Sequence, residues 1–392
     1  MFKIVDLARQ ALGSVAQVAA KVPVIENKFH VMDRLSGPWP EGPFLWLHGA
    51  SLGECKMLLN LANFLKEDLP DCPRILMTTQ KVEVLTFLKE SAEDIESCIA
   101  PADTPSTMRD FIAAAKPLGL VLAENELWPG YLSAMRSLSV KPSIAIVSGR
   151  YRSSFPGVDF SAVGFASMQT GADLSRFLNV ASRASISKMM IGGDWKLLSW
   201  VRSGKDVEAP ENPTVDTAFV SMHMQEWASL CRMIVSSIKR QESVVLVPRR
   251  LSEVDGFRKI LRDQEIMVVE WPLVQKGAVS IVSQFGKTKD VFATSKSAII
   301  GGSFCRGLGV HDFWEPLQRG VATCVGPFTT GQKEAVEGLL HEGVIAQLQS
   351  TAGYSRRNKP DIRLVQTYLE HERTKIADSY QQLLEFLKDL LE

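Results

Sequence analysis

The fold is decided by the stretch Phe44-Leu-Trp-Leu-His-Gly-Ala-Ser-Leu-Gly-Glu54, where an apolar run meets a turn of small residues and then one carboxylate. The apolar run is typical of a buried β-strand, and the turn is typical of a tight connection to a helix. The first N–H groups of a helix are unpaired and attract anions, so this turn could serve a ligand. Glu54 is the only strong base in it. In the alternative, structural interpretation, Ser51 and Gly53 merely cap the helix.

The same alternation of strand and helix continues along the first part of the chain and predicts parallel βαβ units. We place strands near 44–48, 74–79, 96–100, 118–123 and 142–148, with helices near 54–68, 81–91, 104–116 and 127–138. Residues 149–216 hold weaker, mixed elements, including a stretch rich in Pro, Glu and Asp at 205–213 that resembles a linker. The alternation is therefore expected to stop near residue 149.

A second series of strands and helices follows the linker. Strands are predicted near 217–222, 243–248, 266–270, 278–283, 297–301 and 321–325, and helices near 224–239, 252–264 and 331–341. The sequence thus predicts an α/β fold of two Rossmann-like domains that face each other across a cleft. The expected boundaries are 1–40 for an N-terminal segment, 41–210 and 211–362 for the two domains, and 363–392 for a C-terminal helix.

Composition excludes several classes of protein. Among 392 residues, Lys plus Arg and Asp plus Glu both number 44, so the net charge does not indicate a nucleic-acid partner. The six cysteines are scattered without a CxxC pair, which favours free thiols in the cytoplasm and argues against zinc. No apolar run is long enough to span a bilayer. Residues 1–30 have roughly helical apolar spacing, which fits either a membrane-surface helix or one packed on its own domain.

A second carboxylate motif, Leu122-Ala-Glu-Asn-Glu-Leu-Trp-Pro129, follows a predicted strand of the first domain. It places Glu124 and Glu126 at the start of the next helix, on the same edge of the sheet as Glu54. In the structural alternative, Glu126 favours the helix dipole and Trp128-Pro129 starts the helix. Two carboxylate-bearing loops on one sheet edge nevertheless favour a site for chemistry.

The second half carries groups suited to a phosphate. A strand ends in Gly301-Gly302-Ser303, and small residues let backbone N–H groups approach an anion. Glu315 could accept hydrogen bonds from hydroxyl or amino groups, and Arg249 with Arg250 suits phosphate, unless the two are only solvated charges. His223 also follows a strand, where it could equally be a satisfied polar residue. The chain lacks the HExxH, P-loop and GxGxxG motifs.

Together these loops resemble the 3-deoxy-D-manno-octulosonic acid (Kdo) transferases, which are inverting glycosyltransferases of the GT-B architecture that move Kdo from CMP-Kdo onto lipid A. The resemblance runs from about residue 44 to about residue 345. The matching motifs are His48-Gly-Ala-Ser-Leu-Gly-Glu54, Glu124-Asn-Glu-Leu-Trp-Pro129, Arg150, Gly193-Asp-Trp-Lys196, Ser221-Met-His223, Pro248-Arg249, Gly301-Gly-Ser303, Glu315-Pro316 and Gly326-Pro327.

The resemblance implies a role for each matching residue. Glu54 would be the general base and Glu126 would help to arrange the acceptor. The nucleotide-sugar donor would be held by Arg249, Gly301, Gly302, Ser303, His311, Asp312 and Glu315. Further candidates, on the acceptor side or elsewhere, are His48, Ser51, Gly53, Arg150, Lys196 and His223. Because Arg and helix N-termini can receive the leaving phosphate, we expect no metal and no other cofactor. The expected partners are the donor and a lipid A-type acceptor, with peripheral contact to the inner face of the cytoplasmic membrane.

The chain departs from the family pattern on the donor side. Asp312-Phe313-Trp314 stands where the family usually has Asn-Pro-Leu, and Arg250-Leu251 stands where it has His-Pro. The family's longer apolar N-terminal anchor is replaced by the segment 1–30. We therefore identify a divergent member and keep two other hypotheses. The chain could use another nucleotide sugar or a soluble acceptor, or it could be a non-catalytic binding protein of the same fold.

Overall fold

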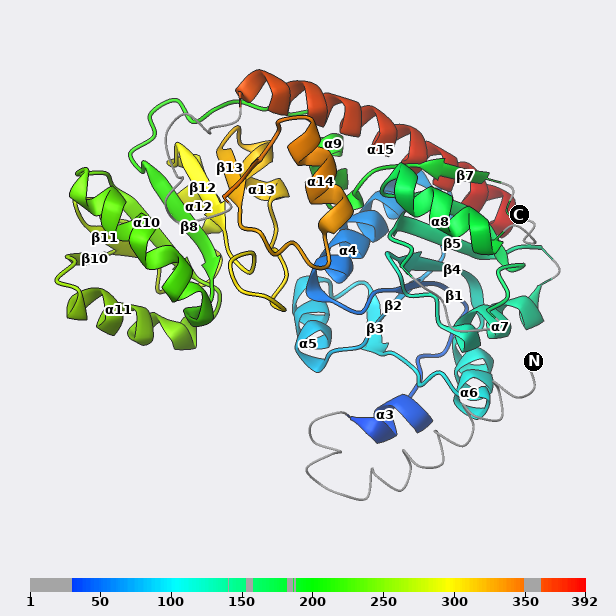
Figure 1. The fold of residues 1–392 in the computed structure, drawn as a ribbon. Coiled ribbons are helices and arrows are strands. Elements are labelled where there is room, and N and C mark those ends of the chain that lie inside the picture. The colour runs from blue at the N-terminus through cyan, green and yellow to red at the C-terminus, as the bar shows by residue number, and fades with distance from the viewer. Residues whose placement is uncertain (1–29, 140, 153–157, 182–185, 187, 349–360) are drawn as a thin grey trace. The chain divides into compact units, whose positions relative to one another are not determined.

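The computed structural model describes residues 30–392 except 140, 153–157, 182–185, 187 and 349–360. The chain divides into two compact α/β units, Met1–Arg202 with Glu372–Glu392, and Ser203–His371. Each unit is built on its own parallel sheet (Figure 1). The predicted amphipathic segment at 1–30 lies, apart from its last residue, outside the described residues.

The first unit holds a seven-stranded parallel sheet in the order β3-β2-β1-β4-β5-β6-β7. Its elements are α3 (Val31–Ser36), β1 (Phe44–His48), α4 (Leu52–Asp68), β2 (Ile75–Thr79), α5 (Val82–Ser91), β3 (Glu96–Ile99), α6 (Pro105–Ala115), β4 (Pro117–Ala123), α7 (Pro129–Leu138), β5 (Ile144–Gly149), β6 (Val163–Met168), α8 (Gly171–Ala181), β7 (Lys188–Ile191), the 3₁₀ turn η1 (Trp195–Leu197) and α9 (Leu198–Ser203). The five strands expected before residue 149 are confirmed as β1 to β5.

The expectation that the alternation stops near residue 149 was wrong, because β6 and β7 extend the same sheet. The sequence of β6, Val-Gly-Phe-Ala-Ser-Met, is poor in the β-branched residues that mark a strand. Its small residues are needed for packing: a Cβ on Gly164 would lie 2.5 Å from the ring of Phe386, and Ser167 Oγ lies 2.6 Å from Ser379 Oγ. The strand is therefore specified by a helix about 200 residues away along the chain, which no local pattern reveals.

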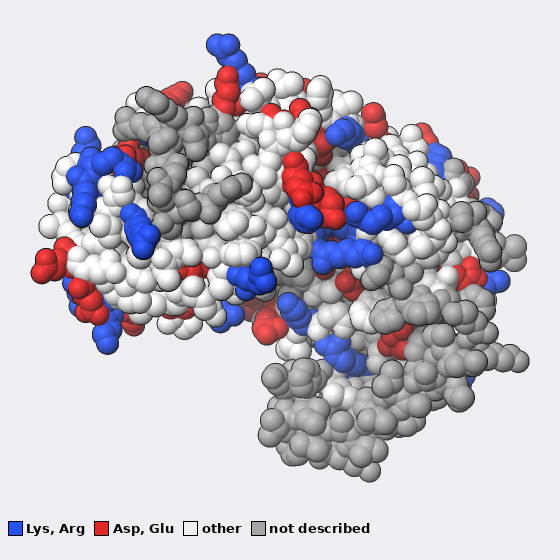
Figure 2. Space-filling view, viewed as in Figure 1, with Lys and Arg blue, Asp and Glu red and all other residues white. Residues whose placement is uncertain are grey.

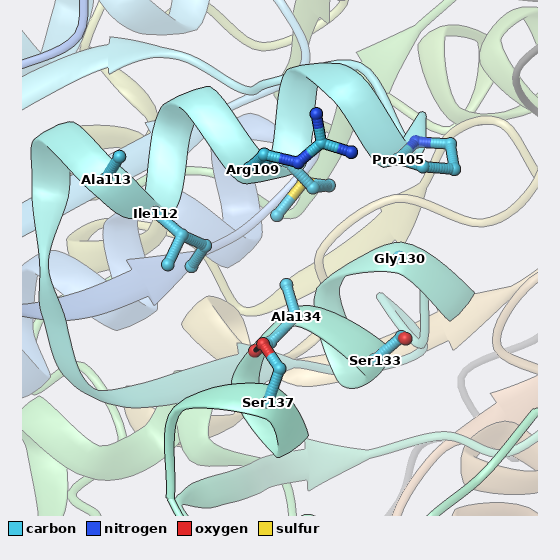
Figure 3. A pocket seen from close by; sticks show the side chains of 9 residues that line it. Pro105, Arg109, Ile112, Ala113, Gly130, Ser133, Ala134 and Ser137 are labelled. Carbon is cyan, nitrogen blue, oxygen red and sulfur yellow. Dashed lines mark hydrogen bonds between the residues drawn. The ribbon is translucent and has the colours of Figure 1, made fainter.

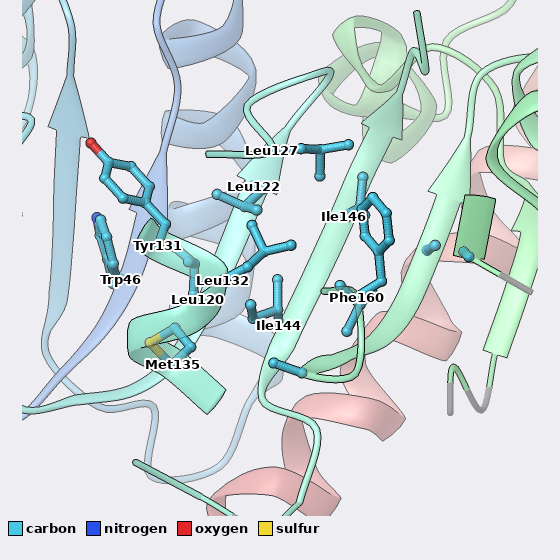
Figure 4. Close-up of a cluster of buried hydrophobic side chains, with 14 of the residues drawn as sticks. Trp46, Leu120, Leu122, Leu127, Tyr131, Leu132, Met135, Ile144, Ile146 and Phe160 are labelled. Atoms are coloured by element: carbon cyan, nitrogen blue, oxygen red, sulfur yellow. The ribbon is translucent and has the colours of Figure 1, made fainter. Parts of the chain in front are cut away.

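A core between α7 and the sheet fixes the loop that carries the second carboxylate motif (Figure 4). Leu120 and Leu122 from β4 and Ile144 from β5 are almost fully buried with Tyr131 and Leu132 from α7. Tyr131 also donates its O–H to Pro101 O at 2.7 Å, so its one polar atom is satisfied. Burial of a large apolar side chain contributes roughly 1.5–3 kcal/mol. The loop between β4 and α7 is thus held at both ends.

The second unit holds a second seven-stranded parallel sheet, in the order β10-β11-β9-β8-β12-β13-β14. Its elements are β8 (Thr217–Met222), η2 (Met224–Glu226), α10 (Trp227–Lys239), β9 (Val244–Pro248), η3 (Leu251–Glu253), α11 (Val254–Asp263), β10 (Val268–Glu270), β11 (Val279–Ile281), α12 (Thr288–Ala293), β12 (Ser297–Ile300), α13 (Trp314–Gln318), β13 (Ala322–Val325), α14 (Lys333–His341) and β14 (Ala346–Gln347). The predicted strands of this half are confirmed. The sequence did not predict α12, α13 and β14, which are too short to show a period.

The predicted C-terminal helix is confirmed as α15 (Ile362–Leu391). Its last part packs on the sheet of the first unit, where a Cβ on Gly119 would lie 2.7 Å from Leu390. No helix among the described residues combines the length and apolarity needed to cross a bilayer. Acidic and basic side chains are interspersed over the face shown in Figure 2, as expected from their equal numbers.

Candidate active site

The first carboxylate, Glu54, lies in the first turn of α4, directly after β1. Ser51 is the N-cap: its side chain accepts a hydrogen bond from Glu54 N at 3.3 Å, and Glu54 Oε2 accepts one from Ser51 N at 2.6 Å. This is a complete capping box, so the turn does cap the helix, as the structural interpretation predicts. Glu54 is 8% exposed, and its carboxylate therefore has both a capping role and a position at the carboxyl edge of the sheet.

The second carboxylate, Glu124, is held between two cations. Lys196 Nζ lies 2.7 Å from its Oε1, and Arg150 Nη1 lies 2.8 Å from its Oε2. Glu124 has a φ of 47°, in the left-handed region that L residues seldom adopt. Such strain persists only where the surroundings over-determine it, and it concentrates at functional sites. Arg150 and Lys196, predicted from separate motifs, are thus brought together by one buried carboxylate.

The third carboxylate, Glu126, lies in the loop before α7 and not inside the helix, which begins at Pro129 after the N-cap Trp128. Its Oε2 accepts a hydrogen bond from Trp128 Nε1 at 2.7 Å and lies 3.3 Å from His48 Nε2. His48 is fully buried in β1, and its Nδ1 lies 2.8 Å from Thr78 Oγ1. Glu126 is therefore fixed by hydrogen-bond donors from two sides.

The three environments separate the acid strengths of the carboxylates. Burial, together with the charges of Glu124 and Glu126, raises the pKa of Glu54 above its ordinary value. Burial alone would also raise the pKa of Glu124, but Lys196 and Arg150 lower it overall. Burial likewise opposes ionisation of Glu126, yet the hydrogen bond and charge of His48 lower its pKa. Among the described residues, no cation contacts Glu54, so it is the carboxylate best suited to accept a proton.

Gly53, Thr78 and Asp194 lie next to residues that hold the three carboxylates in place. Gly53 lies where a Cβ would be 3.5 Å from Lys196 Cε, so the lysine stem passes over the start of α4. Two residues that support this site were not predicted from the sequence. Thr78 lies within hydrogen-bond distance of His48, and Asp194 Oδ1 accepts a hydrogen bond from Lys196 N at 3.0 Å. Thr78 gave no signal because a threonine in an apolar strand is ordinary. Asp194 lay inside the Gly193-Asp-Trp-Lys196 motif but was not singled out.

In the second unit, two predicted histidines meet. His223 follows β8, His311 lies in the loop after β12, and their Nε2 atoms are 2.8 Å apart. The ring centroids are 5.0 Å apart and the planes are inclined by 27°. Burial, with the charge of Arg249, lowers the pKa of His311 to about 4, and burial also lowers the pKa of His223. Both rings are therefore neutral near pH 7.

The glycine loop places His311 beside His223. His311 N donates to Gly301 O at 3.1 Å, and Gly302 has a φ of 76°. A Cβ on Gly301 would collide with Ser221 O, and one on Gly302 would collide with Gly309 O. Close backbone contacts within the protein thus explain these two glycines, which were predicted to approach a phosphate.

Glu226 and Ser303 hold the loops after β8 and β12 in place through hydrogen bonds. The fully buried Glu226 accepts from His223 N and from Phe304 N, both at 3.0 Å, and so ties the strand ends of β8 and β12 together. Ser303 Oγ accepts from Gly326 N at 2.7 Å. Ser303 was predicted to hold the donor, but its hydroxyl has a structural partner. Glu226 was missed because a glutamate three residues into a helix is a common cap.

The residues that depart from the family pattern have structural roles here. Asp312 Oδ1 accepts from Trp314 N at 2.8 Å at the start of α13, and Phe313 and Trp314 are 1% and 4% exposed. Burial and the charge of Asp312 raise the pKa of Glu315, and no hydrogen bond reaches its buried Oε1.

Arg249 is exposed at the end of β9, and its N donates to Met222 O at 2.8 Å. Among the described residues, no carboxylate pairs with its guanidinium.

Two cavities lie away from these clusters. One, of about 450 Å³, is a groove between α6 and α7, where Arg109 and Ile112 face Ser133 and Ser137 (Figure 3). The other, of about 650 Å³, lies at the amino ends of the second sheet and is lined by Asp216 and Lys296, among others. Neither contains a predicted site residue. Within the described part of the chain, no group of three or more His, Cys, Asp or Glu could hold a metal ion.

The class of protein follows from the two parallel-sheet units together with similar structures. A glycosyltransferase from Rickettsia africae superposes with a TM-score of 0.53 at 10% identity, covering 90% of this chain and 99% of that one. A UDP-GlcNAc 2-epimerase from Neisseria meningitidis gives 0.53 at 12% identity, covering 88% and 99%. The fold is that of the GT-B glycosyltransferases and the related epimerases.

Sequence similarity points to one group of transferases. Residues 18–190 match the model of the 3-deoxy-D-manno-octulosonic acid transferases. The 3-deoxy-D-manno-octulosonic acid transferase of Aquifex aeolicus is 25% identical over 88% of this chain and 94% of its own length. That of Chlamydia trachomatis serovar D is 23% identical over 89% and 86%. Over most of its length the chain is thus similar to these transferases, and together with its fold this similarity supports a glycosyltransferase.

Proposed function

We propose that the protein is an inverting glycosyltransferase that transfers Kdo from CMP-Kdo to a lipid A precursor, with Glu54 as general base. The observation that carries the proposal is the difference between three neighbouring carboxylates. Glu124 is neutralised by Lys196 and Arg150, and Glu126 is held by His48 and Trp128. Glu54 alone has a raised pKa and no cation in contact among the described residues. The similarity to the Kdo transferases supports the choice of Kdo and its CMP-activated form.

The proposed reaction is a single displacement. The acceptor hydroxyl attacks the anomeric carbon of Kdo while Glu54 takes the hydroxyl proton. The bond from the anomeric carbon to the phosphate oxygen breaks, and CMP departs with that oxygen and the electron pair. One displacement inverts the anomeric configuration. A base with a raised pKa removes a proton more effectively than an ordinary carboxylate does, and general base catalysis typically contributes about 10²–10⁴-fold.

Glu126 and Glu124 would support this step without taking the proton. The lowered pKa of Glu126 keeps it ionised, so it can accept a hydrogen bond from a neighbouring hydroxyl of the acceptor sugar. Glu124 fixes Arg150 and Lys196 near the start of α4. Removal of Glu126 is therefore expected to raise KM more than removal of Glu124 does, since only Glu126 would touch the acceptor.

The donor would bind to the second unit, on the ends of β9, β8 and β12. Arg249 and Arg250 are exposed there, and the His223–His311 pair lies between the strand ends. Guanidinium groups form paired hydrogen bonds with phosphate and stabilise the charge that develops on the leaving group. Because fixed cations supply this stabilisation, we predict that activity does not depend on a divalent metal. An assay with EDTA against an assay with added Mg²⁺ tests this, and loss of activity in EDTA would contradict it.

A second candidate keeps the fold but changes the donor. It is favoured by Asp312, which stands on the donor side where the family usually has Asn and whose charge raises the pKa of Glu315. A thermal-shift panel of CMP, UDP and GDP distinguishes the candidates. A ligand at about 100 times its dissociation constant stabilises the protein by about 2.7 kcal/mol. We expect a shift with CMP only. A shift with UDP or GDP alone supports the second candidate, and no shift with any nucleotide supports a non-catalytic binding protein.

The proposed function itself is tested by incubation of the protein with CMP-Kdo and a lipid A precursor. CMP release that requires both substrates, with Kdo recovered on the lipid by mass spectrometry, is the expected result. CMP release without transfer to lipid, but with transfer to a soluble sugar, would replace the acceptor and keep the donor. Absence of release with an intact CMP thermal shift would contradict the transferase activity.

A further inference from the structure

The contact between His223 and His311 constrains where protons can sit. With the two Nε2 atoms 2.8 Å apart, one of them must carry a hydrogen and the other must accept it. Two facing N–H groups would clash, and two bare nitrogens would repel. The neutral pair therefore consists of two different tautomers joined by one hydrogen bond.

The pair can gain one proton without losing that hydrogen bond. An added proton occupies the outer nitrogen, Nδ1, of the ring that already donates, so the pair becomes a cation and still has one hydrogen between the rings. A second added proton would place hydrogens on both facing nitrogens and break the contact. The geometry thus allows a neutral state and a singly protonated state of the same structure.

Nearby charges act on the pair in opposite directions. Arg249, whose N donates to Met222 O next to His223, opposes protonation of both rings, whereas the charges of Glu226 and Glu253 favour protonation of His223. Glu226 is fully buried and already accepts two backbone N–H groups. The exposed Arg249 opposes a further positive charge on both rings. An anion bound to this guanidinium cancels that opposition.

We propose that His223 and His311 form a proton-coupled anion site, in which a phosphate group bound beside Arg249 makes the pair take up one proton from solvent. His223 is the ring that gains the charge, because Glu226 accepts its backbone N–H and Glu253 accepts that of the next residue, Met224, so both carboxylates lie near it. The protonated pair then offers the phosphate a cation that is absent from the free protein. The identity of the anion as the phosphate of CMP rests on the proposed function, whereas the anion site does not.

Proton uptake can be measured directly by calorimetry. The heat of CMP binding at pH 7, compared in phosphate-free buffers with different heats of ionisation, gives the number of protons exchanged. Because CMP itself exchanges protons, the quantity of interest is the difference between the wild-type chain and His311→Asn. We expect the wild type to take up a larger fraction of a proton, up to one per CMP, and its affinity to fall by up to about tenfold per pH unit where uptake occurs.

Two further variants complete the design. His223→Asn should abolish the same uptake and keeps the test valid if His311→Asn does not fold. His341→Asn is the matched control, because His341 lies in the same unit and its side chain is 85% exposed. It should leave the proton count unchanged.

The outcomes separate this inference from the proposed function. CMP binding with equal proton counts in wild type and both pair variants overturns the inference and leaves the donor assignment intact. Failure of CMP to bind, with inorganic pyrophosphate still bound and proton-coupled, supports the inference and argues against a CMP-sugar as the donor. Failure of both ligands to bind overturns the anion site.

Discussion

His48 Nδ1 lies 2.8 Å from Thr78 Oγ1, and the opposite nitrogen of the same ring lies 3.3 Å from Glu126 Oε2. An ionised carboxylate only accepts, so Nε2 of His48 carries a hydrogen, while Nδ1 and the Thr78 hydroxyl share the second hydrogen bond of the ring. Trp46 Nε1 donates to the same hydroxyl oxygen at 2.8 Å. A buried chain of hydrogen bonds thus runs from β1 and β2 to the carboxylate that we assign to the acceptor.

The first prediction concerns Thr78, which would act only through His48. Thr78→Val keeps the shape of the side chain but leaves Trp46 Nε1 and His48 Nδ1 without their partner, at a cost of about 1–3 kcal/mol in stability. The His48 ring would lose its fixed tautomer and Glu126 its orientation, so KM for the acceptor should rise about tenfold. Thr78→Ser restores the hydroxyl and should restore KM. Equal kinetics for the valine and serine variants would show that Thr78 has only a packing role.

The second prediction concerns Glu124. Glu124→Gln leaves Arg150 and Lys196 partly buried without their carboxylate, and breaking such a group typically costs about 3 kcal/mol. Because the folded pKa of Glu124 is lowered, its stabilisation is present above the ordinary value of 4.5 and is lost as pH falls through the folded pKa. Urea denaturation at pH 7 and at pH 3 should therefore show a large difference between variant and wild type at pH 7 and a smaller one at pH 3. A difference that grows on acidification would contradict the ion-pair assignment.

The third prediction separates two glycines of the donor loop. Gly302 and Gly307 both have positive φ, but a Cβ at Gly302 would collide with Gly309 O, while nothing lies within 4 Å of one at Gly307. Gly307→Ala should cost about 1 kcal/mol from backbone strain alone. Gly302→Ala should cost clearly more and should weaken CMP binding, because the loop that carries His311 must shift. Thermal unfolding with and without CMP measures both effects, and equal losses at the two positions would exclude the backbone contact as the cause.

The fourth prediction is the acidic limb of the pH–rate profile. Glu54 must be ionised to accept a proton, so kcat should rise with pH through the pKa of this group in the complex. Since burial and the charges of Glu124 and Glu126 raise that pKa, the limb should lie above 4.5. Glu126→Gln removes one of these charges and should move the limb to lower pH. A limb at or below 4.5 in the wild type would contradict the assignment of Glu54.

Much of the fold was predictable because its strands are locally marked. Apolar runs such as Phe44–His48 and Val244–Pro248 are bounded by turn residues, and each proved to be a fully buried strand. The pattern failed at Val163–Met168, where small residues were selected by contact with Phe386 and Ser379 and not by strand propensity. Propensity is a weak signal wherever a distant helix sets the size of each side chain.

The candidate site was predictable as a set of residues but not as a set of partners. Glu54 and Glu126 could be proposed from motifs at strand ends, since parallel strands end on one sheet edge, and Arg150 and Lys196 from the family resemblance. Glu124 pairs with both cations and has a left-handed backbone conformation. Nothing in the sequence indicates either the conformation or the pairing. In the same way, nothing in two separate motifs showed that His223 and His311 would share a hydrogen bond.

Glu54 has two roles, and one comparison of variants separates them. Glu54→Gln keeps an oxygen that can accept from Ser51 N, so the cap survives while the base is lost. Ser51→Ala does the reverse, removing the cap hydroxyl at a cost of about 1 kcal/mol and keeping the base. Measured as kcat for CMP release from CMP-Kdo with lipid A precursor, Glu54→Gln should lose about 10²–10⁴-fold while Ser51→Ala stays within about threefold of wild type. Wild-type kcat in Glu54→Gln, or an equal loss in both variants, would contradict Glu54 as the general base.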